Sequence, residues 1–265
     1  MYKNIDYCYP EGKIKALTMS YDAGSIHDRR LIEIFNRHSI KGSFHIYTGS
    51  LGKSDTVSVE EVSSLYAGHE VSCHTETHPF LERVPGMEIT RQIMYNKERL
   101  EQLCGYVVRG LSYPYGTYDD RTIKIASSLG IRYARRGRNK NWFAVPSDFM
   151  TWEPTCHHKD GIADKLERFK KTTLPMSLFC VWGHSYEFEN DGNWDVIENF
   201  CAAAESLDST WFATCIEICD YINAMRCCEM SSDRSMLYNP SAISVWVAVD
   251  GKPIECRGGA CTRLF

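Results

Sequence analysis

Residues 14–47 read IKALTMSYDAGSIHDRRLIEIFNRHSIKGSFHIY and predict a strand, a helix and a second strand in succession. The apolar run Ile14–Tyr21 has the length and composition of a buried strand. Residues Asp28–Arg37 place apolar side chains at helical spacing, and Ser43–Tyr47 is again apolar and short. This order of elements is typical of parallel β/α units.

The same alternation continues to about residue 225 and predicts an α/β chain. Further strands are expected at Glu70–Cys73, Val107–Tyr113, Ile131–Ala134, near Phe143, and at Ser177–Trp182 and Thr210–Thr214. Further helices are expected at Val59–Tyr66, Met87–Cys104, Asp119–Leu129, Ile162–Lys171, Trp194–Leu207 and Ile216–Met225. About seven parallel strands alternating with helices indicate a (β/α) barrel.

The C-terminal part of the sequence has a different character. Residues 242–249 and 253–256 are short strand-like runs separated by Asp250-Gly251, which is a β-hairpin signal. About 30 residues cannot bury enough surface to fold alone. We therefore expect a barrel over residues 1–228 and a short β-hairpin appendage over 229–265 that packs on it.

Composition excludes several classes of protein. The 265 residues carry a net charge of −4, and no block of basic residues is present, which argues against nucleic acid or an anionic membrane as a partner. No apolar run reaches the roughly 18 residues of a membrane span, and residues 1–6 lack the apolar stretch of a signal peptide. The twelve cysteines are scattered singly, as in a reducing compartment. These features predict a cytoplasmic address.

The sequence His74-Thr75-Glu76-Thr77-His78 directly follows a predicted strand. Two imidazoles four residues apart can converge on one metal ion, and functional groups of parallel barrels collect at the carboxyl ends of strands. Polar residues also mark four other predicted strand ends: Asp22, His45, Tyr115 and His184. Each alone could be a turn residue or a buried polar side chain, but together they supply the parts of a metal-assisted hydrolase.

These motifs resemble, in order, those of the polysaccharide deacetylases of the NodB-homology type, carbohydrate esterase family 4. Residues 20–24 resemble the family's Thr-Phe-Asp-Asp-Gly motif, and residues 74–78 resemble its His-Ser/Thr-x-x-His motif. Residues 113–116 resemble the end of Arg-Pro-Pro-Tyr-Gly, and residues 181–184 resemble a late strand ending in histidine. The resemblance extends from residue 14 to about residue 221. It implies a distorted (β/α)7 barrel.

The resemblance also implies roles for individual residues. Asp22 corresponds to the general base, His184 to the general acid, and His74 and His78 to ligands of a divalent metal, zinc or alternatively cobalt, nickel or manganese. The backbone N–H of Tyr115 corresponds to an oxyanion donor. Such a site removes an acetyl group by metal-assisted attack of water.

Ala23 stands where the family has a third metal ligand, the second aspartate of its first motif. A methyl group cannot bind a cation, so metal affinity should be weakened. The residue could mark an inactivating substitution, a natural loss of function or a rebuilt site. Candidate replacement ligands are His27, His45, His157 and His158, each of which could equally be an ordinary loop or buried histidine.

Two further positions depart from the family. Ser112 replaces the arginine that pairs with the catalytic base, and Arg135 or Arg136 could reach the same carboxylate instead. The family's Asp-x-x-Asp-Trp motif, which tunes the acid histidine, is only echoed by residues 148–152. From motif position we expect Trp152 and Tyr115 to line the substrate site.

The sequence thus predicts a metal-dependent carbohydrate deacetylase acting on N- or O-linked acetyl groups, impaired by Ala23. One alternative is a catalytically degenerate carbohydrate-binding protein on the same barrel. Another is a hydrolase of a non-sugar amide. The expected partner is an acetylated saccharide.

Overall fold

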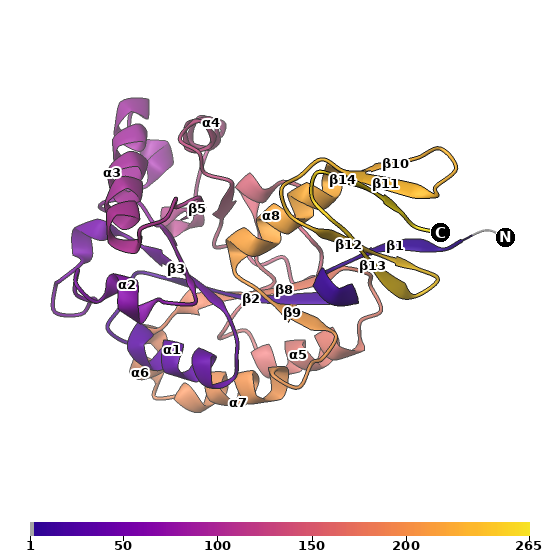
Figure 1. The fold of residues 1–265 in the computed structure, drawn as a ribbon. Coiled ribbons are helices and arrows are strands. Elements are labelled where there is room, and N and C mark those ends of the chain that lie inside the picture. Colours follow the sequence, from indigo (N-terminus) through magenta and orange to yellow (C-terminus); the bar gives the residue numbers. More distant parts are fainter. Residues whose placement is uncertain (1–2) are drawn as a thin grey trace.

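A computed structural model describes residues 3–265, which are built around one parallel sheet (Figure 1). The strand order along the sheet is β6-β5-β4-β3-β2-β8-β7. Their bounds are β2 Lys15–Asp22, β3 Gly42–Ile46, β4 Glu70–Cys73, β5 Gly110–Ser112, β6 Tyr133–Arg135, β7 Cys156–His157 and β8 Ser177–His184. The short β9 (Thr210–Phe212) pairs with the first three residues of β2, on the edge that β3 occupies farther along. The curled seven-strand sheet confirms the predicted barrel.

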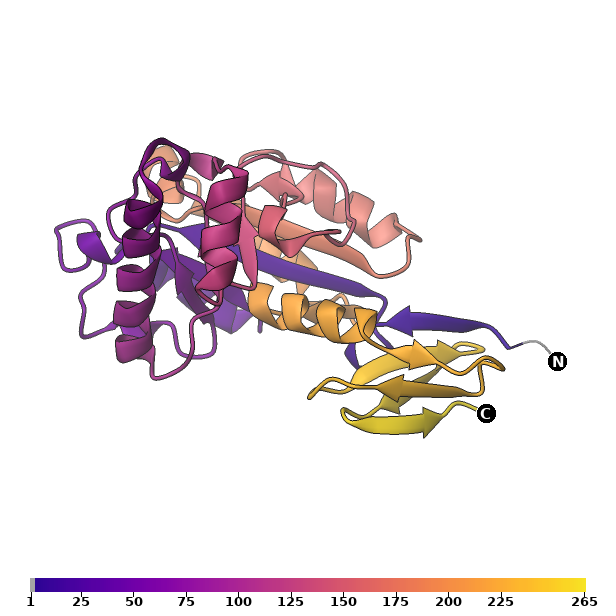
Figure 2. The same cartoon turned by 90° about the horizontal axis from the view of Figure 1, so that it is seen from above.

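Helices surround the sheet (Figures 1 and 2). They are α1 Asp28–Arg37, α2 Val62–Leu65, α3 Gly86–Cys104, α4 Asp120–Ser128, α5 Ile162–Lys171, α6 Tyr186–Asp191, α7 Trp194–Ala204 and α8 Cys215–Arg226. The predicted bounds of α1 and α5 are confirmed. Both segments have regular apolar spacing, which predicts helices well. Over residues 3–265, none of the helices has the combination of length and apolar character needed to cross a bilayer.

The strand predicted near Phe143 is wrong. Phe143 lies in a loop, where its ring packs against Phe169 and Phe179 and its carbonyl accepts one hydrogen bond from Leu178 N. A buried aromatic side chain there satisfies the core without a strand. The strand that continues the sheet is instead the two-residue β7, which pairs with β8.

The register of β2 places the site. All eight residues of this strand are buried, and its last residue, Asp22, lies opposite His45 of β3 and His184 of β8. In the same sheet Ser112 of β5 lies opposite Arg135 of β6. Parallel strands bring their carboxyl ends to one edge, so residues far apart in sequence meet there.

The predicted C-terminal hairpin is present as β12 (Val245–Val249) and β13 (Lys252–Cys256). The structure adds the N-terminal strand β1 (Ile5–Cys8), which pairs antiparallel with β12. A second small sheet contains β10 (Glu229–Met230), β11 (Met236–Asn239) and β14 (Ala260–Arg263). Both sheets lie at one end of the molecule near α8, together with the two termini (Figure 2).

Candidate active site

A cavity of about 320 Å³ opens at the carboxyl ends of the strands. It brings together Asp22, His74, His78, Tyr115 and His184, which the sequence places on four separate motifs. The remaining lining residues are Tyr113, Gly116, Arg135, Gly137, Trp182 and Tyr186. The volume is within the range of small-molecule sites.

Trp152 is not part of this cavity, so its predicted place in the substrate site is wrong. Its side chain is only 1% exposed and packs edge-on against Tyr133 and Phe149. Its backbone extends the sheet as a parallel bridge to Arg135. The aromatic walls of the cavity are formed instead by Trp182 and Tyr186, together with Tyr115.

Asp22 is held by a buried polar network. The Arg135 guanidinium forms an ion pair with Asp22 Oδ2 and donates to Ser112 Oγ (2.7 Å) and Ser20 Oγ (2.8 Å). Ser112 Oγ in turn donates to Asp22 Oδ2 (3.2 Å). Burial, the largest single effect, would raise the pKa of Asp22, but the charge of Arg135 together with the smaller effects of nearby histidines holds the pKa well below its ordinary value. Asp22 Oδ1 accepts no hydrogen bond from the described residues and can therefore take up a proton.

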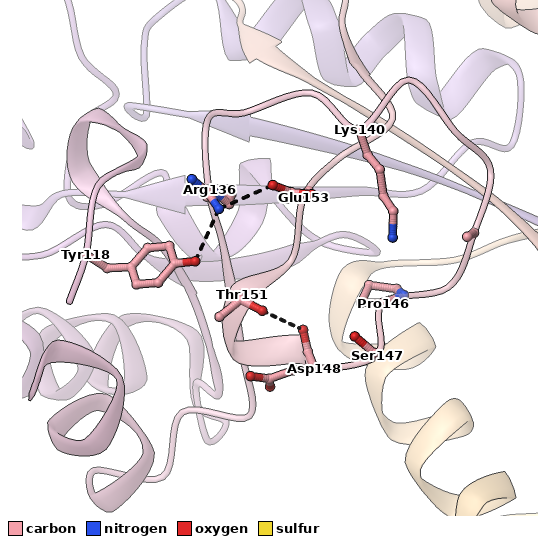
Figure 3. A pocket seen from close by; sticks show the side chains of 9 residues that line it. Tyr118, Arg136, Lys140, Pro146, Ser147, Asp148, Thr151 and Glu153 are labelled. Atoms are coloured by element: carbon pink, nitrogen blue, oxygen red, sulfur yellow. Dashed lines mark hydrogen bonds and ion pairs between the residues drawn. The ribbon is translucent and has the colours of Figure 1, made fainter. Parts of the chain in front are cut away.

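Arg135 and Arg136 are the candidates to replace the arginine that the family has at position 112. Only Arg135 contacts Asp22. Arg136 points into a neighbouring cavity, where it donates to Glu153 (3.2 Å) and Tyr118 (3.3 Å) (Figure 3). Adjacent residues of a strand face opposite sides, so only one of the pair can reach the barrel interior.

His74 and His78 lie together in the wall of the cavity, with ring centroids 4.6 Å apart. His74 Nδ1 lies 2.8 Å from the Ser112 carbonyl oxygen, so it carries the proton and leaves Nε2 with a free lone pair. Burial lowers the pKa of His74 to about 4 and also lowers that of His78. Two neutral imidazoles, one oriented by a backbone carbonyl, suit a metal ion.

A third ligand is missing beside this pair. Ala23 lines a second cavity of about 440 Å³ with His27 and Asp55, and its φ of 92° is in the left-handed region. Over residues 3–265, no group of three His, Cys, Asp or Glu donors within 4.8 Å of one another includes His74 or His78. The donor set therefore fits the family's metal only in part.

The other replacement candidates lie elsewhere. His45 is fully buried in the sheet, where its Nε2 lies 2.9 Å from Ser20 Oγ. His157 and His158 lie around Glu187. None of these completes a three-ligand group with the His74–His78 pair.

His184 is oriented by Glu187, a residue for which no sequence motif predicts a catalytic role. Glu187 Oε2 accepts from the backbone N–H of His184 (3.0 Å) and from its Nδ1 (3.1 Å). Burial would raise the pKa of Glu187, but the surrounding histidines hold it well below its ordinary value. Asp148 begins the stretch that only echoes the family's motif for this task, and it instead accepts from Met150 N (2.8 Å) in a short turn. The sequence signal for this role of Glu187 is its spacing, three residues after the histidine that ends the strand.

Tyr115 forms part of the cavity wall between His78 and Phe80. Its ring stacks on Phe80 (3.7 Å between centroids) and meets His78 edge-on (4.6 Å). Its backbone is left-handed, with φ 58°, in the short helix Pro114–Gly116. The role of its N–H as an oxyanion donor stays a prediction.

Comparison with known proteins agrees with the motifs. The family model for polysaccharide deacetylase matches residues 10–134. This part of the chain belongs to the polysaccharide deacetylase family. The matched stretch contains Asp22, His74, His78 and Tyr115, whereas His184 lies outside it.

The relatives of this chain are distant. Chitin deacetylase 1 of Cryptococcus neoformans is 30% identical over 116 residues, which are 43% of this chain and 24% of the relative. A peptidoglycan-N-acetylglucosamine deacetylase of Bacillus cereus is 24% identical over 123 residues, 46% of this chain and 44% of the relative. The chain thus spans less than half the length of these relatives.

A solved structure supports the fold over most of the chain. A Mycobacterium smegmatis protein classed as a polysaccharide deacetylase superimposes with a TM-score of 0.65 at 16% identity. The match covers 83% of this chain and 94% of that protein. At this identity it supports the barrel architecture alone.

Proposed function

We propose that this protein removes acetyl groups, N- or O-linked, from a carbohydrate bound in the 320 Å³ cavity. The observation that carries the proposal is the register of β2 and β8, which sets Asp22 beside His184 at one level of the sheet. A carboxylate held ionised and an imidazole that line the same cavity suit base and acid chemistry.

Asp22 is the proposed general base. Arg135 and Ser112 occupy its Oδ2, so Oδ1 is the atom that takes a proton from the attacking water. His184 is the proposed acid, which delivers a proton to the leaving amine or alkoxide. The Glu187 carboxylate accepts a hydrogen bond from His184 Nδ1 and so fixes the orientation of its ring.

His74 and His78 would hold a divalent metal, zinc or a related ion. When bound, this ion polarises the acetyl carbonyl and lowers the barrier to hydrolysis. Ala23 supplies neither a ligand atom nor a negative charge, so we expect weak metal binding and weak activity.

Trp182 and Tyr186 offer aromatic faces on which a sugar ring can stack. The relatives are named for chitin and for peptidoglycan N-acetylglucosamine, so a saccharide containing N-acetylglucosamine is the proposed substrate class. The predicted cytoplasmic address favours a small saccharide over a cell-wall polymer.

Ala23 favours a second candidate function, a carbohydrate-binding protein on a barrel that has lost catalysis. An assay of acetate release distinguishes the two candidate functions. It compares the wild type with Ala23→Asp on N-acetylglucosamine oligomers, with added zinc or cobalt. Aspartate is among the residues that tolerate a left-handed backbone, so the variant should fold. Ala23→Asn is the matched control, because it has the same shape without the charge.

If the deacetylase proposal is correct, Ala23→Asp releases acetate roughly 100-fold faster or more than the wild type, since loss of even an outer-shell partner of a metal costs 10–100-fold. Ala23→Asn should stay near the wild type. No acetate from any variant on any oligomer would contradict the proposal and favour the binding protein.

A further inference from the structure

A second group of potential metal ligands includes His184, which lines the same cavity as His74 and His78. His157 Nε2 and His184 Nδ1 each lie 3.1 Å from Glu187 Oε2, and all three ligand atoms lie within 4.8 Å of one another. The three side chains are 14%, 26% and 18% exposed, so the group is partly buried and still reachable from solvent. Two strands and a helix supply it: β7, β8 and α6.

A buried polar side chain without a partner adjoins this group. His158 is 2% exposed, neither of its ring nitrogens has a hydrogen-bond partner in the described residues, and its Nε2 lies 3.5 Å from Glu187 Oε2. Its ring is stacked between Tyr21 and Phe188. Gly183 makes room for it, since a Cβ there would lie 2.0 Å from His158 Nδ1.

We propose that His157 Nε2, His184 Nδ1 and Glu187 Oε2 bind a divalent transition-metal ion, zinc or cobalt, at a site separate from the His74–His78 pair. Two imidazoles and one carboxylate are a donor set used by zinc sites that keep a fourth position open for water. The Glu187 carboxylate also supplies a negative charge, which the His74–His78 pair lacks because residue 23 is alanine. This cluster is therefore the stronger cation site of the two.

Lys159 is the charge that opposes a cation here, and it has an alternative partner. Its Nζ lies 3.4 Å from Glu187 Oε1 but 2.7 Å from Asp191 Oδ2, and its side chain is 41% exposed. It can remain paired with Asp191 while Glu187 Oε2 turns to the metal.

Occupancy would affect the proposed reaction. The metal takes the place of the proton between His184 Nδ1 and Glu187, so His184 can no longer become the charged acid. Zinc in excess would then inhibit deacetylation. This consequence rests on the proposed function, whereas binding of the ion does not.

Titration of the metal-free protein with Co²⁺, followed by its visible absorption, and with Zn²⁺ by calorimetry tests the site. His157→Asn should weaken the tight binding event roughly 100-fold or more, because loss of a direct ligand costs at least as much as loss of an outer-shell partner. His38→Asn is the matched control, since His38 also pairs with a glutamate, Glu205, but belongs to no three-ligand group. His74→Asn should likewise retain tight binding.

Wild-type protein that binds neither ion, or tight binding that survives His157→Asn and disappears in His74→Asn, would overturn the proposal. His157→Gln repeats the measurement if the asparagine variant is unstable. In the Ala23→Asp background, excess zinc should lower acetate release, and His157→Asn should remove this inhibition. If that background releases no acetate, the proposed function fails while the binding titration still decides the cation site.

Discussion

Asp22 is a charged side chain in a position that water barely reaches, so its partner decides whether it stays ionised. Its side chain is 5% exposed and that of Arg135 is 1% exposed. A buried carboxylate without a partner would take up a proton instead of staying charged. Arg135 therefore keeps Asp22 ionised from β6, whereas the family places this guanidinium on the preceding strand.

Replacing Arg135 by Met should destabilise the protein by about 3–5 kcal/mol, the cost of breaking a buried ion pair from one side. In the wild type the pKa of Asp22 is lowered, so its contribution to stability is present above about pH 4 and lost as the pH falls below it. In Arg135→Met burial dominates and raises this pKa, so stability decreases as the pH rises. Urea unfolding from pH 4 to 7 should show the difference growing with pH.

Arg136→Met is the matched control for this prediction. Arg136 forms a partly exposed ion pair with Glu153, and such pairs contribute at most about 1 kcal/mol. Equal losses of stability in the two variants, or a difference that does not change with pH, would show that Arg135 does not hold the charge of Asp22.

The site residues divide by how local their signals are. Asp22, His74 and His184 could be predicted because each directly follows an apolar strand and falls in an ordered motif. The choice between Arg135 and Arg136 depends on which face of a strand meets the barrel interior. The place of Trp152 depends on its parallel bridge to Arg135. Those properties come from tertiary pairing, so the sequence left the first open and led to the wrong place for the second.

At the scale of elements, long periodic segments were predictable and short ones were not. α1 and α5 follow from apolar spacing alone, whereas β7 has two residues and α6 has six. β7 exists because β8 provides hydrogen bonds for it, and α6 is a short helix that directly follows the end of β8. Yet β7 carries His157 and α6 carries Glu187, so the unpredicted elements supply two of the three ligands of the proposed second cation site.

The turn Pro114–Gly116 is an element whose shape depends on one glycine. Gly116 has φ 68°, and a Cβ there would lie 2.4 Å from the backbone nitrogen of Gly137. Both segments line the cavity next to Tyr115. The close approach of two backbones fixes the position of the expected oxyanion donor.

Gly116→Ala should therefore lose stability and also acetate release, because the turn has to move away from Gly137. Gly130→Ala is the matched control: it has φ 84° but nothing within 4 Å of the added methyl group. The control should lose only the roughly 1–2 kcal/mol of a left-handed alanine and keep its activity. Activity can be read in the Ala23→Asp background. Identical behaviour of the two variants would show that the contact with Gly137 does not position the turn.

At the scale of the whole molecule, α8 ties the barrel to both ends of the chain. Tyr221 OH donates to the Cys8 carbonyl (2.6 Å) and accepts from Trp246 N (3.0 Å). One side chain of the last barrel helix thus contacts β1 and β12 together. This arrangement explains how the small C-terminal sheets gain a buried face that their own length could not provide.

Glu70, the first residue of β4, is buried at the amino ends of the strands, on the side of the sheet away from the active-site cavity. Its carboxylate accepts from Ser43 Oγ (2.6 Å), Tyr133 OH (2.8 Å) and the backbone N–H of Ile216 (3.0 Å). These partners lie on β3, β6 and α8, so one buried group connects four elements. Burial raises the pKa of Glu70 to about 7, although the three hydrogen bonds oppose the shift.

This raised pKa predicts how the stability of the molecule depends on pH. The folded protein binds a proton at Glu70 between about pH 4 and 7 that the unfolded chain has released, so the wild type loses stability as the pH rises through this window. Glu70→Gln does not titrate. Its amide can donate to Tyr133 OH, whose own proton can then be donated to Ser72 Oγ, 3.2 Å away, instead of to residue 70. The free energy of unfolding of the variant, measured in urea, should therefore rise relative to that of the wild type by a few kcal/mol from pH 4 to 8. Glu255→Gln, at an exposed carboxylate bonded to Ser244, should stay within about 0.5 kcal/mol. A constant difference for Glu70→Gln would mean that Glu70 is ionised throughout, with its three donors outweighing burial.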